Sequence, residues 1–232
     1  MRATAGVSPG EPGACRNARM STKTGETMLS ERFTQAVDYA REAHALQKRK
    51  GTSVPYIAHL LGVAAMVLDH GGDEDQAIVA LLHDVVEDQG GHHEQLIRRQ
   101  FGDRVADIVM ACTDGTQESK AAAQTPEEKR ADWSQRKRRY LAHLAGVSDD
   151  ALLVSACDKL HNARAIVGDL HDPAVGETVF GRFTGGRDGT LWYYGEIARI
   201  LRERGSTLAS RLAEAAVEMA AKPAPPRFSG KP

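Results

Sequence analysis

The sequence predicts an all-α fold. Apolar residues recur at helical spacing through residues 28–221, glycines and prolines separate these stretches, and alternating strand patterns are essentially absent. With 232 residues, 41% of them hydrophobic, the chain is long enough for one domain with an ample core. We expect disorder at 1–27, which is rich in Gly, Pro, Ala, Thr and Arg without periodicity, and in the proline-rich tail 222–232.

The first helices are indicated by their caps and apolar faces. Ser30 can cap a helix, and Gly51 to Pro55 reads as a loop. The segment 59–70 is apolar nearly all round, which predicts a buried helix that ends at Gly71 and Gly72.

The middle of the chain continues this pattern. Asp73 can cap a helix that ends at Gly90, and shorter helices are expected at 94–101 and 103–112. The polar stretch 113–124 is expected to be a loop.

The sequence TPEE begins the next helix. Thr125 can cap it, Pro126 takes the first helical position and Glu128 can close a capping box. The remaining elements follow in order: a helix after Ser148, a flexible loop at 181–189, and two last helices at 190–204 and 206–221.

One segment interrupts the apolar pattern. In LLHDVVED, residues 81–88, helical spacing places His83, Asp84, Glu87 and Asp88 on one continuous polar stripe. Several carboxylates side by side are tolerable only if they are solvated, paired or neutralised by a cation. Histidine together with aspartate indicates a divalent metal.

Two lone polar residues in apolar stretches add to this signal. His59 lies early in SVPYIAHLLGVAAMVL, and Asp158 lies in the middle of LLVSACDKLHNARAI. Taken singly, the histidine reads as a satisfied core residue and the aspartate as a cap or salt-bridge partner. Taken together, two imidazoles and two carboxylates favour Mn²⁺, Fe²⁺ or Zn²⁺ over Ca²⁺ or Mg²⁺, without choosing among the three.

The order histidine, His-Asp pair, distant aspartate resembles the ligand set of HD phosphohydrolases. PYIAHLLGVA, ALLHDVVED and ACDKLHNAR are similar to three motifs in the hydrolase domain of RelA/SpoT proteins and in small alarmone hydrolases. These enzymes remove the 3′-pyrophosphate from guanosine tetra- and pentaphosphate with manganese. The resemblance, over about residues 29–201, implies an HD-domain helical bundle with manganese held by four metal ligands: His59, His83, Asp84 and Asp158.

Glu87 and Asp88 are surplus negative charges beside a phosphate-rich substrate, because Asp84 and Asp158 already balance a divalent ion. A carboxylate next to the attacking water can orient it and take its proton. The resemblance makes this pair catalytic, with Glu87 as general acid/base and Asp88 assisting. The alternative is a solvated helix end, which the helix dipole disfavours.

Basic residues are candidates for holding the anionic substrate. The resemblance assigns Arg49 to stacking on guanine and Lys50 to a phosphate. Because the loop differs in length from that of relatives, Lys48 and Arg49 are an alternative pair for these two roles. A further alternative is that the loop is a solvated basic turn without a role in binding. We assign Arg136 and Lys137 to the 5′-phosphates, against an ordinary charged surface.

Asn162 lies four residues after Asp158, on the same helical face, and is expected to contact ribose or base. Lys159 and His161 are expected to be surface or packing residues. In LWYY, residues 191–194, the resemblance places a substrate-facing tyrosine, although neither tyrosine is assigned. The arginine that relatives carry one turn earlier is absent from its expected place, and Arg187 is a candidate replacement.

Composition narrows the class of protein. Thirty basic against 31 acidic residues give a net charge of −1, so we expect neither nucleic acid nor membrane as a partner. The three cysteines are far apart, which argues against a disulfide framework or zinc knuckle and for a reducing cytoplasm. No apolar run or signal peptide indicates membrane insertion or export.

Three functions from different classes remain. The first is a metal-dependent guanosine-3′,5′-bis(diphosphate) 3′-pyrophosphohydrolase with a small nucleotide as its partner. The second is an HD phosphohydrolase acting on another nucleotide or nucleotide-like substrate, with the same ligands and a different base pocket. The third is a non-catalytic scaffold, which intact ligands disfavour. A synthetase domain would need a much longer chain, so we expect hydrolysis alone.

Overall fold

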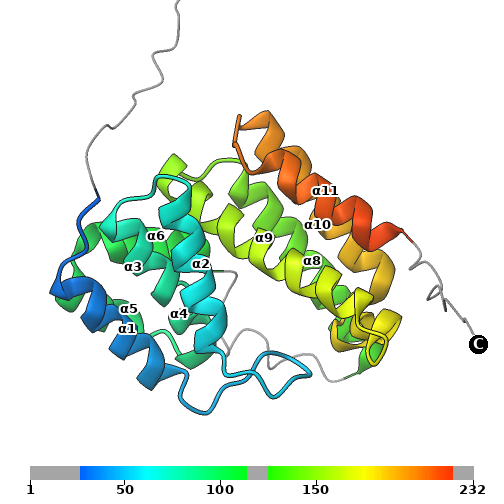
Figure 1. The fold of residues 1–232 in the computed structure, drawn as a ribbon, viewed down its shortest axis with the longest axis horizontal. Helices are drawn as coiled ribbons and strands as arrows, with labels where there is room; N and C mark the ends of the chain where they lie inside the picture. The colour runs from blue at the N-terminus through cyan, green and yellow to red at the C-terminus, as the bar shows by residue number, and fades with distance from the viewer. Residues whose placement is uncertain (1–26, 114–124, 222–232) are drawn as a thin grey trace, which may run out of the picture.

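The computed structural model describes residues 27–113 and 125–221, and within these ranges the chain is helical with one isolated bridge between Lys48 and Pro55 (Figure 1). The described elements are α1 Glu31–Ala43, α2 Ile57–Asp69, α3 Glu74–Leu82, α4 Val85–Gln89, α5 His93–Phe101, α6 Asp103–Cys112, α8 Pro126–Leu144, α9 Asp149–His171, the 3₁₀ helix η1 Gly176–Arg182, α10 Gly186–Glu203 and α11 Ala209–Ala220. The prediction of an all-α fold is confirmed. The expected disorder at 1–27 and 222–232 and the expected loop at 113–124 lie, apart from Thr27 and Thr113, outside the described residues.

Local capping starts four of the helices as predicted. Ser30, Asp73, Thr125 and Ser148 each accept a hydrogen bond from a backbone N–H two or three residues further on. Asp73 and Thr125 do so within capping boxes, and Pro126 occupies the first turn after Thr125. Each such cap stabilises its helix by about 1 kcal/mol.

The helix expected to run from Asp73 to Gly90 is divided in two. α3 ends at Leu82 and α4 begins at Val85, so His83 and Asp84 form the junction. The His83 Nδ1–H donates to the Ala80 carbonyl oxygen at 2.8 Å, which satisfies one of the carbonyls in the last turn of α3. The prediction of one continuous helical stripe is therefore wrong in this detail, because the positions of His83 and Asp84 are determined by a turn between two helices.

The glycine-rich segment 181–189 is also more regular than expected. η1 extends to Arg182 and α10 begins at Gly186, four residues before the predicted start. A Cβ atom on Gly185 would lie 2.6 Å from Trp133 Cζ2, and one on Gly189 would lie 2.9 Å from Cη2. These glycines therefore allow the indole of α8 to pack against α10, rather than marking a loop.

α9 lies in the middle of the molecule and joins its two halves (Figure 1). It contacts α2, α3 and α6 on one side, and α10, α11 and η1 on the other. Apolar side chains are fully buried where these helices meet, among them Leu60 and Val63 of α2, Leu81 of α3 and Leu160 of α9. Burial of each large side chain contributes about 1.5–3 kcal/mol, so α2, α3 and α9, which carry or directly precede the predicted ligands, are held firmly together. No helix among the described residues is long and apolar enough to span a membrane.

Candidate metal centre

Four side chains from three places in the fold converge on one point. His59 Nε2 lies 3.2 Å from Asp158 Oδ1 and 3.8 Å from Asp84 Oδ2. His83 Nε2 lies 3.2 Å from Asp84 Oδ2 and 3.7 Å from Asp158 Oδ1. Both Nε2 atoms are buried without a hydrogen-bond partner among the described residues. Because buried polar atoms are nearly always paired, two such nitrogens facing two carboxylates fit a metal ion.

Hydrogen bonds on the far side of each imidazole hold Nε2 toward this centre. His83 Nδ1 is engaged by the Ala80 carbonyl, and His59 Nδ1 lies 3.0 Å from His161 Nδ1. Burial, with His59 and Arg49 nearby, lowers the pKa of His161 to about 4, so its neutral ring can accept the His59 N–H. Backing of this kind fixes the tautomer of a ligating histidine.

The expectation that His161 is a surface or packing residue is therefore wrong. A helical signal for its position was present, because His161 lies three residues after Asp158 and so near the same face of α9. Gly62 of α2 makes room for the ring: a Cβ there would lie 2.7 Å from His161 Cδ2 and closer still to Nε2.

The two carboxylates are also held by hydrogen bonds. The Tyr56 hydroxyl donates to Asp84 Oδ2 at 2.5 Å. Lys159 Nζ donates to Asp158 Oδ2 at 2.5 Å, and Asn162 Nδ2 donates to Asp158 Oδ1 at 2.6 Å. Lys159 is thus a partner of the centre and not the surface or packing residue expected from the sequence.

The electrostatics of the centre favour a cation. Burial lowers the pKa of His59, which keeps its imidazole neutral. Burial also opposes charge on His83, but Asp84 and Asp158 outweigh it and hold the pKa of His83 well above its usual range. Burial raises the pKa values of both carboxyl groups, yet His83 beside Asp84, and Lys159 beside Asp158, bring them below normal. The carboxylates stay ionised and stabilise positive charge between them.

Glu87 and Asp88 occupy different surroundings. A cavity of about 100 Å³ lies at the centre, and Glu87 lines it together with His83, Asp84 and Asp158. Asp88 is not among its lining residues. Its Oδ2 accepts from Gln47 Nε2 at 2.7 Å, which ties α4 to the loop after α1.

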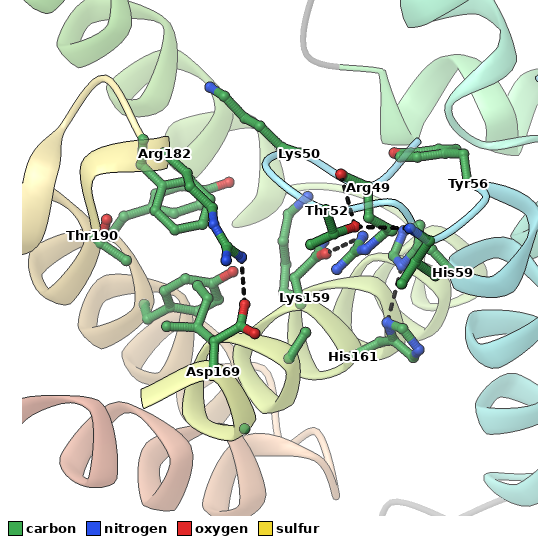
Figure 2. Close-up of a pocket in the computed structure, with 18 of the residues that line it drawn as sticks. Arg49, Lys50, Thr52, Tyr56, His59, Lys159, His161, Asp169, Arg182 and Thr190 are labelled. Atoms are coloured by element: carbon green, nitrogen blue, oxygen red, sulfur yellow. Dashed lines mark hydrogen bonds and ion pairs between the residues drawn. The ribbon is translucent and has the colours of Figure 1, made fainter. Parts of the chain in front are cut away.

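A larger cavity of about 640 Å³ adjoins the centre and has the size of a small-molecule site (Figure 2). It shares Tyr56, Lys137, Lys159 and Asn162 with the smaller cavity. Among the described residues that line it, Asp169 is the single carboxylate, and the basic residues are Arg49, Lys50, Lys137, Lys159 and Arg182. The cavity therefore suits an anionic ligand.

The structure brings four of the five predicted substrate contacts to this cavity: Arg49, Lys50, Lys137 and Asn162. Arg49 Nη1 donates to Asn162 Oδ1 at 2.9 Å, so the loop is connected through Asn162 to Asp158. Arg136 does not line the cavity, and its Nε donates to Asp132 Oδ2 at 2.9 Å.

Comparison with known proteins identifies the family of this chain. The sequence pattern of the HD domain matches residues 36–190. The chain belongs to the HD domain family. The predicted resemblance and the HD-domain helical bundle are confirmed.

Several curated relatives of this HD domain share one name, guanosine-3′,5′-bis(diphosphate) 3′-pyrophosphohydrolase. The Xenopus tropicalis relative, MESH1, is 38% identical over 133 residues, which cover 56% of this chain and 66% of the relative. The Drosophila melanogaster MESH1 is 31% identical over 141 residues, 60% of this chain and 71% of the relative. The Aquifex aeolicus relative is 43% identical over 84 residues, which are 36% of this chain and only 12% of that longer protein.

Solved structures agree on the fold. A metazoan ortholog of SpoT, described as hydrolyzing ppGpp, has a TM-score of 0.63 and 26% identity, covering 82% of this chain and 96% of that chain. The structure of lmo0812 from Listeria monocytogenes EGD-e, at 24% identity and a TM-score of 0.55, covers 73% of this chain and 96% of its own, and shows the shared fold alone.

The HD domain also places residues that the sequence left unassigned. Tyr193 and Tyr194 are both buried and both line the larger cavity. Arg187, a candidate replacement for the missing arginine, instead donates through Nη2 to the Ala220 carbonyl oxygen at 2.9 Å and does not line the cavity. Arg182 lines it instead and pairs with Asp169. No local pattern distinguished Arg182 from the surrounding residues of the expected loop.

Proposed function

We propose that this HD domain is a guanosine-3′,5′-bis(diphosphate) 3′-pyrophosphohydrolase. The observation that carries the proposal is the pair of buried, unpartnered imidazole nitrogens facing two carboxylates, next to a cavity lined by basic residues. The names of the relatives and of the SpoT ortholog supply the substrate.

The metal site in this proposal consists of His59, His83, Asp84 and Asp158. The mixed nitrogen and oxygen donors fit Mn²⁺, with Fe²⁺ or Zn²⁺ as alternatives. When bound, such an ion supplies a Lewis acid at the phosphoryl oxygen and acidifies the attacking water.

Glu87 is the general acid/base, because it lines the small cavity without belonging to the ligand set. It takes a proton from the water that attacks the phosphorus attached to O3′ of the ribose. The P–O3′ bond then breaks, and the protonated Glu87 returns the proton to O3′, which releases guanosine 5′-diphosphate and pyrophosphate. Asp88 assists by fixing α4 to Gln47 and thereby holds Glu87 in place.

Basic residues neutralise the substrate around this centre. Lys159 and Lys137 line both cavities, and we assign both to the phosphates that leave from the 3′ side, so Lys137 moves there from the 5′-phosphates expected from the sequence. Arg49 stacks on the guanine, Lys50 contacts a phosphate and Asn162 contacts the ribose. Arg136, which faces Asp132, has no part in this arrangement.

A second candidate is an HD phosphohydrolase acting on another nucleotide. The observation that favours it is Thr190, which lines the cavity one turn before Tyr194, where an arginine was expected. Its buried hydroxyl donates to the Gly186 carbonyl oxygen and offers a ligand no charge.

The test is a substrate panel with the metal-reconstituted protein. We expect guanosine tetraphosphate and Mn²⁺ to yield guanosine 5′-diphosphate and pyrophosphate, while nucleoside triphosphates and monophosphates are poor substrates. The His83→Ala variant is the control and should be inactive. Brisk turnover of another nucleotide, with no pyrophosphate released from guanosine tetraphosphate, would replace the first candidate with the second.

A further inference from the structure

One face of α9 runs along the larger cavity from the metal centre to its far end. Asp158 and Asp169 are eleven residues apart, which is about three helical turns, so they share this face at a separation of ~16 Å along the helix axis. Asn162, Ala165 and Ile166 line the cavity between them. A ligand whose reacting group lies at Asp158 can therefore extend toward Asp169.

The far end of this face carries one ion pair. Arg182 Nη1 of η1 donates to Asp169 Oδ2 at 2.5 Å, and Figure 2 shows the guanidinium projecting into the cavity above Asp169. Among the described residues, this is the one hydrogen bond that Arg182 makes. A guanidinium has five N–H donors, so Nε and Nη2 remain for a ligand.

The stem of Arg182 is confined from the opposite side. An ideal Cβ on Gly51 would lie 2.6 Å from both Cδ and Nε of Arg182, and Gly51 has a positive φ of 73°. Gly51 belongs to the same loop as Arg49 and Lys50. Arg182 therefore runs between this loop and α9 and is only 19% exposed, unlike a solvated surface arginine.

We propose that Arg182 binds the terminal phosphate of a nucleoside 5′-diphosphate, with Asp169 as the residue that positions its guanidinium. This inference rests on the proposed function, because the 3′-diphosphate must lie at the metal centre and the 5′-diphosphate must then lie away from it. Arginine matches phosphate with two parallel N–H···O bonds, which the free Nε and Nη2 edge can form. It supplies the positive charge that Thr190 and Arg187 do not bring to the cavity.

Binding of the product provides a test that does not depend on turnover. We would measure calorimetrically the affinity of the metal-loaded protein for guanosine 5′-diphosphate and for guanosine. Arg182→Ala should weaken guanosine 5′-diphosphate binding by about tenfold or more, since hydrogen bonds to charged groups are the strong ones, and leave guanosine binding unchanged. Asp169→Asn should weaken it less, because the guanidinium keeps its charge but loses its anchor.

Two further variants complete the design. Arg187→Ala removes a neighbouring arginine that faces away from the cavity, and should change neither affinity. Arg182→Lys keeps the charge but lacks the planar fork, so it should also weaken guanosine 5′-diphosphate binding and replaces Arg182→Ala if that variant fails to fold. Equal affinities in wild type and Arg182 variants, equal losses for both ligands, or tighter binding by Asp169→Asn would overturn the inference.

Kinetics separate this inference from the proposed function. Arg182→Ala should raise KM for guanosine tetraphosphate with little change in kcat, and leave KM unchanged for a guanosine 3′-diphosphate that lacks 5′-phosphates. Normal pyrophosphate release with no dependence of KM on Arg182 overturns the inference and leaves the proposed function standing. Arg182-dependent binding of guanosine 5′-diphosphate by a wild-type protein that releases no pyrophosphate overturns the proposed function instead.

Discussion

Gly62→Ala is expected to weaken metal binding even though it places a better helix former in α2. In a helix interior, alanine is more favourable than glycine by about 0.8–1 kcal/mol, so propensity alone predicts a more stable protein. Packing predicts a displacement of His161, because the new Cβ would lie 2.7 Å from His161 Cδ2. The ring must move, and its 3.0 Å contact with His59 Nδ1 is then lost.

The size of the effect follows from the role of that contact. Loss of a hydrogen bond behind a ligating histidine typically reduces metal affinity by about 10–100-fold. This range corresponds to about 1.4–2.8 kcal/mol of binding free energy, which exceeds the gain in helix propensity. We therefore expect weaker Mn²⁺ binding without a matching loss of thermal stability in the metal-free protein.

The assay is calorimetric titration of the metal-free protein with Mn²⁺, alongside thermal unfolding. Gly195→Ala is the matched control, since Gly195 lies inside α10 and a Cβ there would meet no atom within 4 Å. It should leave metal affinity unchanged. In the double variant with His161→Ala, Gly62→Ala should cost nothing further, because both changes act through one ring. Unchanged or tighter Mn²⁺ binding by Gly62→Ala would refute the reasoning.

Three other variants test the centre and the cavity. His83→Ala should lose both stoichiometric metal, measured by elemental analysis, and pyrophosphate release; metal retained in full would contradict the ligand assignment. Glu87→Gln should keep its metal and lower kcat by about two orders of magnitude; unchanged kcat would leave Glu87 a helix-end charge. Arg49→Ala should mainly raise KM for guanosine tetraphosphate, since a stacked guanidinium contributes about 1–2 kcal/mol; an unaltered KM would remove its role in binding the base.

Local chemistry made much of this protein predictable from sequence. Ser30, Thr125 and Ser148 cap helices because a side-chain oxygen reaches a backbone N–H a few residues away, and that interaction needs no distant partner. His59 and Asp158 were identifiable because a polar residue inside an apolar helix must find a partner once the helix is buried. These two residues converge with His83 and Asp84, and these are the four residues that the family resemblance named as ligands.

Only the tertiary structure decided which side chains face the site. Helical periodicity states which residues share a face, but the element packed against that face determines their partners. His161 became a neighbour of His59 because α2 and α9 are in contact. Lys159 turns toward Asp158, the residue before it on α9, and Arg136 faces Asp132 on its own helix.

The positions of glycines and charged residues in segments expected to be loops were the hardest to predict from the sequence. Gly185 and Gly189 read as a flexible loop, although Trp133 packs where their side chains would lie. Arg182 carried no distinguishing pattern, because its place in the cavity depends on Asp169 of α9 and on the space left by Gly51. The sequence by itself determined most of the helices and the chemistry of the proposed metal ligands. The walls of the cavity depend instead on contacts between residues far apart in the chain, which only packing brings together.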